Sequence, residues 1–228
     1  MKIFLDGGSL DDISLYSKNQ KISGFTTNPS LLKKSKIKNY KDFVLKCNKL
    51  TNKPISFEVT ADNYSKMLEQ SEWLMKHSKN CFIKIPILNT KGEYNKKIIL
   101  KLNSIGCKLN ITAVFTEKHV DKILKMINKR SNTIISIFSG RIADTGKDPV
   151  KLIRYSYNKT KKLKKVKILW ASVREIYNYY EAKNNNCDII TLDKNILEKL
   201  KLKNKNLNQY SKETSMQFFK DGKKIKFI

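Results

Sequence analysis

The sequence predicts an α/β protein, a single (β/α)8 TIM barrel with an extra C-terminal helix. Two observations carry this prediction. Short apolar segments rich in β-branched residues alternate with longer amphipathic segments, a pattern typical of parallel strands joined by crossover helices. The alternation occurs eight times in 228 residues, and eight such units fit a closed barrel better than an open sheet.

The predicted strands are short and mostly apolar, as parallel strands covered on both faces should be. They cover Lys2–Asp6, Ile22–Thr26, Ile55–Thr60, Cys81–Pro86, Lys108–Val114, Thr133–Phe138, Lys167–Ala171 and Asp188–Leu192. The helices predicted between them cover Leu10–Lys18, Tyr40–Leu50, Ala61–His77, Lys91–Ile105, Thr116–Lys129, Pro149–Lys162, Val173–Lys183 and Asn195–Leu200. A last helix is predicted over Lys212–Asp221. We therefore expect one domain over residues 1–228, with residues 205–228 as a helical tail.

The composition excludes several classes of protein. Hydrophobic residues make up 40% and charged residues 29%, which fits neither a disordered chain nor a membrane protein. No stretch approaches the roughly 20 apolar residues that cross a bilayer, and Asp6 interrupts any signal-peptide hydrophobic segment. The GxGxxG and GxxxxGK[ST] nucleotide-binding motifs are also missing. We therefore expect a cytoplasmic enzyme or binding protein.

The net charge of +27 is carried almost entirely by lysine, because only four of the 47 basic residues are arginine. Lys, Asn and Ile all have AT-rich codons, so we interpret much of this charge as genomic base bias on solvated faces. The alternative is a nucleic-acid or polyanion-binding barrel without catalysis, through Lys159–Lys167 and Lys199–Lys205. Arginine-rich clusters and interleaved aromatic residues are missing, so we do not expect a nucleic-acid partner.

The four cysteines, Cys47, Cys81, Cys107 and Cys187, form no CxxC pair and fit no zinc spacing. We expect free thiols in a reducing compartment, with most of them buried as small hydrophobes. The two histidines lie in polar helical stretches. The sequence therefore predicts no metal site.

In a barrel of this type the catalytic groups sit at the carboxyl ends of the strands. Seven consecutive predicted strand ends carry polar residues that could converge on one cavity. These are Asp6; Thr26, Thr27 and Asn28; Glu58 and Thr60; Lys84; Asn110 and Thr112; Ser136 and Arg141; and Ser172 and Arg174.

Lys84 is the most informative of them, because it lies inside the apolar run Cys81–Ile87. A lysine inside a parallel strand is costly unless it is paired or neutral. A neutral amine in a pocket attacks carbonyls and forms a Schiff base. The alternatives are a structural ion pair, or a strand-end lysine that reaches water.

Two carboxylates, Asp6 and Glu58, could supply the proton shuttle and the activated water that Schiff-base chemistry needs. As alternatives, Asp6 caps a turn and Glu58 pairs with a cation inside the barrel. Arg141 and Arg174 could bind a phosphate group with their planar forks, with Ser172 beside them. The alternative for Arg174 is a surface pair with Glu175 or Glu181.

Six segments together resemble the transaldolase family, in order and over nearly the whole chain. They are GFTTNPS (Gly24–Ser30), FEVTA (Phe57–Ala61), FIKIP (Phe82–Pro86), LNITAVFT (Leu109–Thr116), SIFSGRIAD (Ser136–Asp144) and WASVRE (Trp170–Glu175). The short chain is similar to the small subfamily that includes fructose-6-phosphate aldolase. The resemblance implies a class I aldol mechanism on an (α/β)8 barrel without a metal or organic cofactor.

The resemblance also implies a role for each matching residue. Lys84 would form the Schiff base with a ketose phosphate, Asp6 would be the general acid/base for cleavage of C3–C4, and Glu58 and Thr112 would position a catalytic water. The remaining implied contacts are to sugar hydroxyls (Thr26, Asn28, Asn110 and Ser136), to the cavity wall (Phe138) and to the sugar phosphate (Arg141, Ser172 and Arg174).

Within that family the implied activity is a transaldolase of the pentose phosphate type. It would move a dihydroxyacetone unit from sedoheptulose 7-phosphate or fructose 6-phosphate to an aldose phosphate. The aldolase branch has Gln, Tyr and Gly where this chain has Glu58, Phe138 and Asn110. The alternatives are an aldolase-like carbon–carbon lyase and a transaldolase-like enzyme of a dedicated sugar pathway. The chain departs from the family pattern at Gly7-Gly8, Ile137 and Val173, positions that lie around the substrate and affect the choice of sugar and not the type of reaction.

The same resemblance implies a homo-oligomer, a pentamer or decamer whose subunits exchange a C-terminal helix. The segment Tyr210–Phe219 carries the apolar residues Met216, Phe218 and Phe219 that such a contact needs. The alternative is a helix that closes the barrel of its own subunit.

Overall fold

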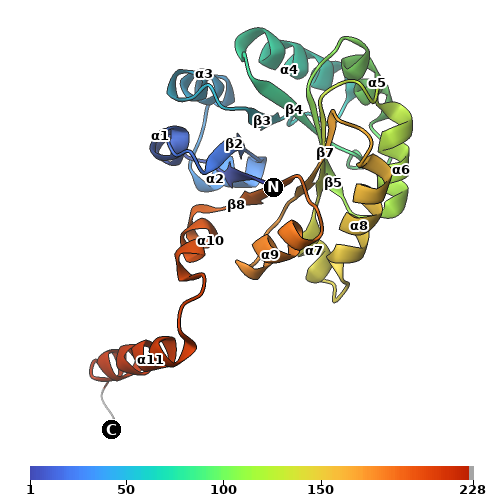
Figure 1. Cartoon of the computed structure of the whole chain (residues 1–228). Helices are drawn as coiled ribbons and strands as arrows, with labels where there is room; N and C mark the ends of the chain where they lie inside the picture. The colour runs from blue at the N-terminus through green and yellow to red at the C-terminus, as the bar shows by residue number, and fades with distance from the viewer. Residues whose placement is uncertain (226–228) are drawn as a thin grey trace.

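Eight parallel strands close into a barrel in which each strand pairs with its neighbour in sequence and β8 pairs with β1 (Figure 1). The structure is a computed structural model that describes residues 1–225; residues 226–228 of the predicted tail lie outside the described residues. The strands are β1 (Lys2–Asp6), β2 (Ile22–Thr26), β3 (Ile55–Glu58), β4 (Cys81–Pro86), β5 (Leu109–Val114), β6 (Thr133–Ile137), β7 (Val166–Trp170) and β8 (Ile189–Leu192). The predicted (β/α)8 barrel is therefore confirmed.

The helices follow the strands in alternation, and most of them cover the outside of the barrel. They are α1 (Leu10–Ser17), α2 (Pro29–Lys34), α3 (Tyr40–Leu50), α4 (Tyr64–His77), α5 (Lys96–Ser104), α6 (Glu117–Met126), α7 (Ser139–Ala143), α8 (Pro149–Thr160), α9 (Tyr177–Asn184), α10 (Lys194–Glu198), the 3-10 turn η1 (Lys199–Leu202) and α11 (Leu207–Gly222). None of these described helices is long and apolar enough to cross a membrane.

Several helix bounds differ from the predicted ones for local reasons. The helix predicted from Ala61 begins at Tyr64, because the Asn63 side chain caps it by accepting from the N–H of Lys66. The helix predicted from Lys91 begins at Lys96, because the segment before α5 forms a turn closed by a bridge between Leu88 and Tyr94. The short helices α2 and α7 were not predicted, because six and five residues leave too little periodicity to detect.

The interior of the barrel is divided by an apolar layer. Alternate residues of a strand point inward, and the inward side chains at mid-height form one buried apolar cluster. Its members are Phe4, Ile134, Leu169, Ala171 and Ile189. Gly24 makes room for it, because a Cβ there would lie 2.7 Å from the Phe4 ring. This layer separates the carboxyl end of the barrel from the amino end.

The C-terminal helix α11 lies away from the barrel at the lower left of Figure 1. It has no buried residue, and Met216, Phe218 and Phe219 are all exposed. The structure therefore does not support the alternative that this helix closes the barrel of its own subunit.

Candidate active site

Strand register brings the predicted catalytic residues together at the carboxyl end of the barrel. Glu58 at the end of β3 lies opposite Lys84 on β4, and Lys84 lies opposite Asn110 on β5. Asp6 at the end of β1 lies opposite Thr26 on β2. Residues far apart in sequence thus become nearest neighbours because the strands are parallel and in register.

A cavity of about 540 Å³ opens at this end, a size that suits a small-molecule site. It is lined by nearly all of the predicted site residues: Asp6, Thr26, Asn28, Glu58, Lys84, Thr112, Ser136, Phe138, Arg141, Ser172 and Arg174. Asn110 is the exception, since it is fully buried behind the cavity wall. The structure therefore brings eleven of the twelve together at one surface.

Lys84 is the buried cation of the site, with only 6% of the residue exposed. Its Nζ lies 2.9 Å from Glu58 Oε2 and donates a hydrogen bond to the Thr27 carbonyl oxygen at 2.9 Å. The sequence left open whether Lys84 is paired or neutral, and the structure shows it paired. A carboxylate in contact with the amine is also a ready acceptor for its proton.

Asp6 faces the same cavity and is held by a chain of hydroxyls. Thr26 Oγ1 donates to Asp6 Oδ1 at 2.8 Å and lies 2.5 Å from Thr191 Oγ1. Because the single Thr26 proton goes to Asp6, Thr191 must be the donor to Thr26. Burial raises the pKa of Asp6 above its ordinary value, although the Lys84 charge and the Thr26 hydrogen bond both oppose that shift. An acid with a raised pKa can give and take a proton closer to neutral pH.

A second polar chain fixes the wall between β3 and β6. Ser136 Oγ donates to Asn110 Oδ1 at 2.6 Å, and Asn110 Nδ2 donates to Ser56 Oγ at 2.9 Å. The Thr112 hydroxyl is buried with no hydrogen-bond partner among residues 1–225. Since an unpaired buried hydroxyl is costly, this group is suited to hold a water or a substrate oxygen.

The loops after β6 and β7 pack tightly at the cavity rim. Ser172 adopts a left-handed backbone with φ of 62°, and a Cβ on Gly140 would collide with the Ser172 carbonyl oxygen. Only glycine fits at position 140, because any other residue would overlap this backbone. The Gly-Arg pair of the α7 segment thus places Arg141 beside the loop that carries Arg174.

The two arginines have different partners. The Arg174 side chain forms an ion pair with Asp144, with Nε 3.1 Å from Asp144 Oδ1, and not with Glu175 or Glu181, the partners considered as the alternative to phosphate binding. The Arg141 guanidinium lies 5.2 Å from the centre of the Phe138 ring. Asp144 uses the Nε side of the Arg174 fork, so the Nη1 end is left to meet an anion.

Sequence analysis missed the eighth strand end, where Thr191 and Asp193 also line the cavity. The signal was available, since Ile189, Thr191 and Asp193 share one face by strand alternation. Asp193 caps α10 by accepting from the N–H of Ile196. Its charge adds to the factors that raise the pKa of Asp6.

Potential metal ligands are dispersed. Within residues 1–225, no group of three His, Cys, Asp or Glu side chains is close enough to hold a metal ion. The four cysteines are buried free thiols, and burial raises the pKa of Cys47, Cys81, Cys107 and Cys187 alike to about 12. These thiols are therefore protonated at neutral pH and act as packing groups.

Comparison with known proteins agrees with this geometry. Residues 3–227 match the profile of the family described as Transaldolase/Fructose-6-phosphate aldolase. A probable transaldolase of Nitrosopumilus maritimus is 30% identical over 99% of this chain and 96% of its own. One from Thermoplasma acidophilum is 30% identical over 99% of this chain and 96% of its own, and one from Carboxydothermus hydrogenoformans is 32% identical over 88% and 90%. The chain is thus an enzyme of the transaldolase/fructose-6-phosphate aldolase family.

Proposed function

We propose that the protein is a transaldolase that moves a dihydroxyacetone unit from a ketose phosphate to an aldose phosphate through a Schiff base on Lys84. The donor is fructose 6-phosphate or sedoheptulose 7-phosphate. The observation that carries the proposal is the buried contact of 2.9 Å between Lys84 Nζ and Glu58 Oε2 at the floor of a cavity. Relatives named probable transaldolases support it.

The first half of the reaction forms the imine. Glu58 accepts a proton from the Lys84 ammonium, and the neutral amine attacks C2 of the donor ketose. Proton transfers through a water between Glu58 and Thr112 then expel the C2 oxygen as water, leaving a protonated imine. The buried, unpartnered Thr112 hydroxyl supports this role, since a bridging water would satisfy it.

The second step breaks the bond between C3 and C4. Asp6 takes the proton from the C4 hydroxyl, the C3–C4 electron pair moves toward the imine nitrogen, and the aldose phosphate leaves. The three-carbon unit remains as an enamine on Lys84 until an acceptor aldehyde reverses these steps. Thr26 and Thr191 orient the Asp6 carboxyl group for the proton transfer, as their chain of hydrogen bonds indicates.

Substrate contacts follow from the remaining cavity residues. Arg141, Ser172 and the free end of Arg174 bind the phosphate group. Thr26, Asn28 and Ser136 bind hydroxyls of the dihydroxyacetone unit, while Phe138 forms the apolar wall. Asn110 does not contact the substrate itself but positions Ser136, because it accepts the hydrogen bond that orients the Ser136 hydroxyl.

Transfer and release are the two competing outcomes for the enamine. The Glu58 carboxylate stabilises a positive charge on the Lys84 nitrogen, so the bound intermediate persists. Phe138 has no hydroxyl with which to orient a hydrolytic water. Both features favour transfer to an acceptor over release of free dihydroxyacetone, which is the outcome expected of the alternative aldolase-like lyase.

The test compares donor turnover with and without an acceptor. With fructose 6-phosphate, addition of erythrose 4-phosphate should raise turnover at least about tenfold over release of free dihydroxyacetone, a barrier difference of about 1.4 kcal/mol. The double variant Glu58→Gln with Phe138→Tyr should shift the ratio toward release. Equal rates with and without acceptor would reject the transaldolase assignment in favour of the lyase.

We further propose a homo-oligomer, a pentamer or decamer, in which α11 packs on a neighbouring subunit. The exposed apolar side chains of Met216, Phe218 and Phe219 support this assembly, because such residues rarely cluster on the free surface of a soluble protein. Light scattering at working concentration measures the mass of the particle. A monomer would reject the proposal.

A further inference from the structure

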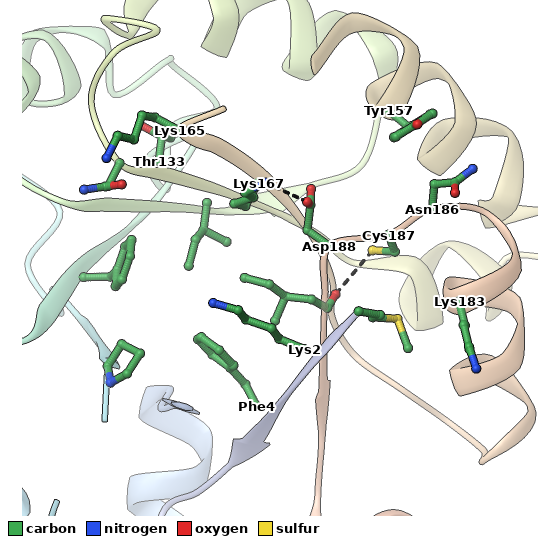
Figure 2. Close-up of a pocket in the computed structure, with 16 residues that line it drawn as sticks. Lys2, Phe4, Thr133, Tyr157, Lys165, Lys167, Lys183, Asn186, Cys187 and Asp188 are labelled. Atoms are coloured by element: carbon green, nitrogen blue, oxygen red, sulfur yellow. Dashed lines mark hydrogen bonds and ion pairs between the residues drawn. The ribbon is translucent and has the colours of Figure 1, made fainter. Parts of the chain in front are cut away.

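A second cavity, of about 720 Å³, lies at the amino end of the barrel (Figure 2). It shares no lining residue with the cavity at the carboxyl end. Its floor is apolar, and its rim carries lysines from β1, from β7 and the turn before it, and from α9. Its lining residues include Lys2, Phe4, Phe82, Lys165, Lys167 and Asp188.

We propose that this amino-end cavity binds a small organic monophosphate with an aromatic body. The proposal concerns a site that the proposed transaldolase reaction does not use. It rests on three observations about the cavity: which way its lysines face, how little of their charge is neutralised, and what lies beneath them.

Two of the lysines at this end occupy inward-facing strand positions. Lys2 shares the inner face of β1 with Phe4, and Lys167 shares the inner face of β7 with Leu169. Figure 2 shows the Lys2 side chain extending into the cavity that Phe4 also lines. Both lysines are exposed to solvent, but they face a concave apolar cavity, whereas the lysines on the outer helices face bulk water.

The positive charge of the cavity is only partly neutralised. Four of its described lining residues are lysines, and Asp188 is the one carboxylate among them. Asp188 Oδ1 lies 3.0 Å from Lys167 Nζ, and within residues 1–225 Lys2 and Lys165 have no carboxylate at ion-pair distance. Like charges around a concave, low-dielectric mouth focus their field and attract an anion.

The floor selects the kind of anion. Phe4, Phe82, Ile134 and Ile189 line the inner part of the cavity, so a fully hydrated inorganic ion would leave this surface uncovered. An anion with a flat apolar body covers it and keeps its phosphate at the lysine rim. The cavity volume lies within the range of ordinary small-molecule sites, roughly 300–1,000 Å³.

Adenosine 5′-monophosphate is a suitable probe, with adenosine and inorganic phosphate as separate ligands, each titrated by calorimetry. We expect one saturable site for the monophosphate, and affinities at least about tenfold weaker for either half alone. Lys2→Met should weaken binding of the monophosphate by about tenfold. Lys167→Met should weaken it more, because it also leaves the Asp188 carboxylate unpaired beside the ligand.

Two control variants distinguish binding in this cavity from general charge attraction and from binding in the carboxyl-end cavity. Lys66→Met removes the same charge from an exposed position on α4. Arg141→Met removes a cation from the carboxyl-end cavity. Both variants should bind the probe with the affinity of the unmodified protein. Circular dichroism checks that each variant is folded. The proposal is overturned if no saturable binding occurs, if Lys66→Met weakens binding as much as Lys2→Met, if binding depends on Arg141, or if either half alone binds as tightly. Dependence on Arg141 would place the probe in the carboxyl-end cavity, whereas the comparison of Lys2→Met with Lys66→Met does not depend on whether the protein is a transaldolase.

Discussion

Phe4 and Asp6 lie on the same face of β1, two residues apart, yet they line different cavities. The same step separates Phe82 from Lys84 on β4, and Ile134 from Ser136 on β6. On these three strands, the residue nearer the carboxyl end thus carries a carboxylate, an amine or a hydroxyl group. The residue two positions earlier is aromatic or aliphatic. One strand serves both ends because alternate residues share a face and parallel strands align their ends.

The polar groups of the two ends also differ in how they are held. At the carboxyl end Lys84 is almost fully buried and contacts both a carboxylate and a carbonyl oxygen. At the amino end the lysines are exposed, and Lys167 pairs with a partly exposed Asp188. Burial with fixed partners positions a group for chemistry, whereas exposed charge can only attract. The predictions below test this difference, from the largest expected effect to the smallest.

The largest effect is expected for Lys84→Arg. Arginine keeps the positive charge but cannot form a useful imine, so turnover should fall at least about a thousandfold. The matched control is Lys108→Arg just before β5, whose Nζ donates a hydrogen bond to Asn80 Oδ1. Steady-state kinetics with circular dichroism measure both variants. If Lys84→Arg retains activity, or the control loses it equally, the two ends do not differ as described.

A smaller loss is expected for Arg174→Ala and Arg141→Ala with phosphorylated donors. Removing a charge-assisted contact costs about 1.5–3 kcal/mol, so kcat/KM should fall about ten- to a hundredfold, mainly through KM. Transfer from unphosphorylated donors should change far less. Arg130→Ala, at the amino end, should leave kcat/KM unchanged for both kinds of donor. Equal losses on both substrate types would make these arginines structural.

Thr26→Val should move the acidic limb of the pH–rate profile. The Thr26 hydrogen bond lowers the pKa of Asp6, while burial raises it more. Removing the hydroxyl therefore raises the pKa further, and the acidic limb should shift to higher pH. Thr26→Ser, which keeps the hydroxyl, should restore the original profile. A profile that stays in place in Thr26→Val would show that Asp6 does not set that limb.

The smallest effect concerns stability. Because the pKa of Asp6 is raised in the fold, its ionised form costs stability, and that cost appears as pH rises through the folded pKa. Asp6→Asn should therefore stabilise the protein at neutral pH relative to the unmodified chain, and the gain should shrink as pH falls toward 4, near the ordinary Asp value. Asp188→Asn, which loses the Lys167 pair, should instead cost up to about 1 kcal/mol at neutral pH. Thermal melts across this range measure both, and a gain for Asp6→Asn that grows on acidification would contradict the account.

The fold and the floor of the active site were predictable because their signals are local. β-branched runs mark the strands, and a lysine between isoleucines in Cys81–Ile87 is conspicuous. The Thr191–Thr26–Asp6 chain was missed although a closed barrel brings β8 beside β1, because the polar residues of the eighth strand end were left out of the candidate site. The pairing of Arg174 with Asp144 was not predicted either, since Asp144 comes from another loop. The amino-end lysines could not be singled out from the sequence, because lysine is abundant along the whole chain.

The central claim is that one lysine, fixed at the carboxyl end, carries the chemistry of a barrel rich in lysines. Borohydride reduction in the presence of fructose 6-phosphate, followed by peptide mapping with mass spectrometry, tests it directly. The account predicts a reduced three-carbon adduct on Lys84 alone, absent without sugar. An adduct on Lys2, Lys167 or any other lysine, or no adduct at all, would contradict it.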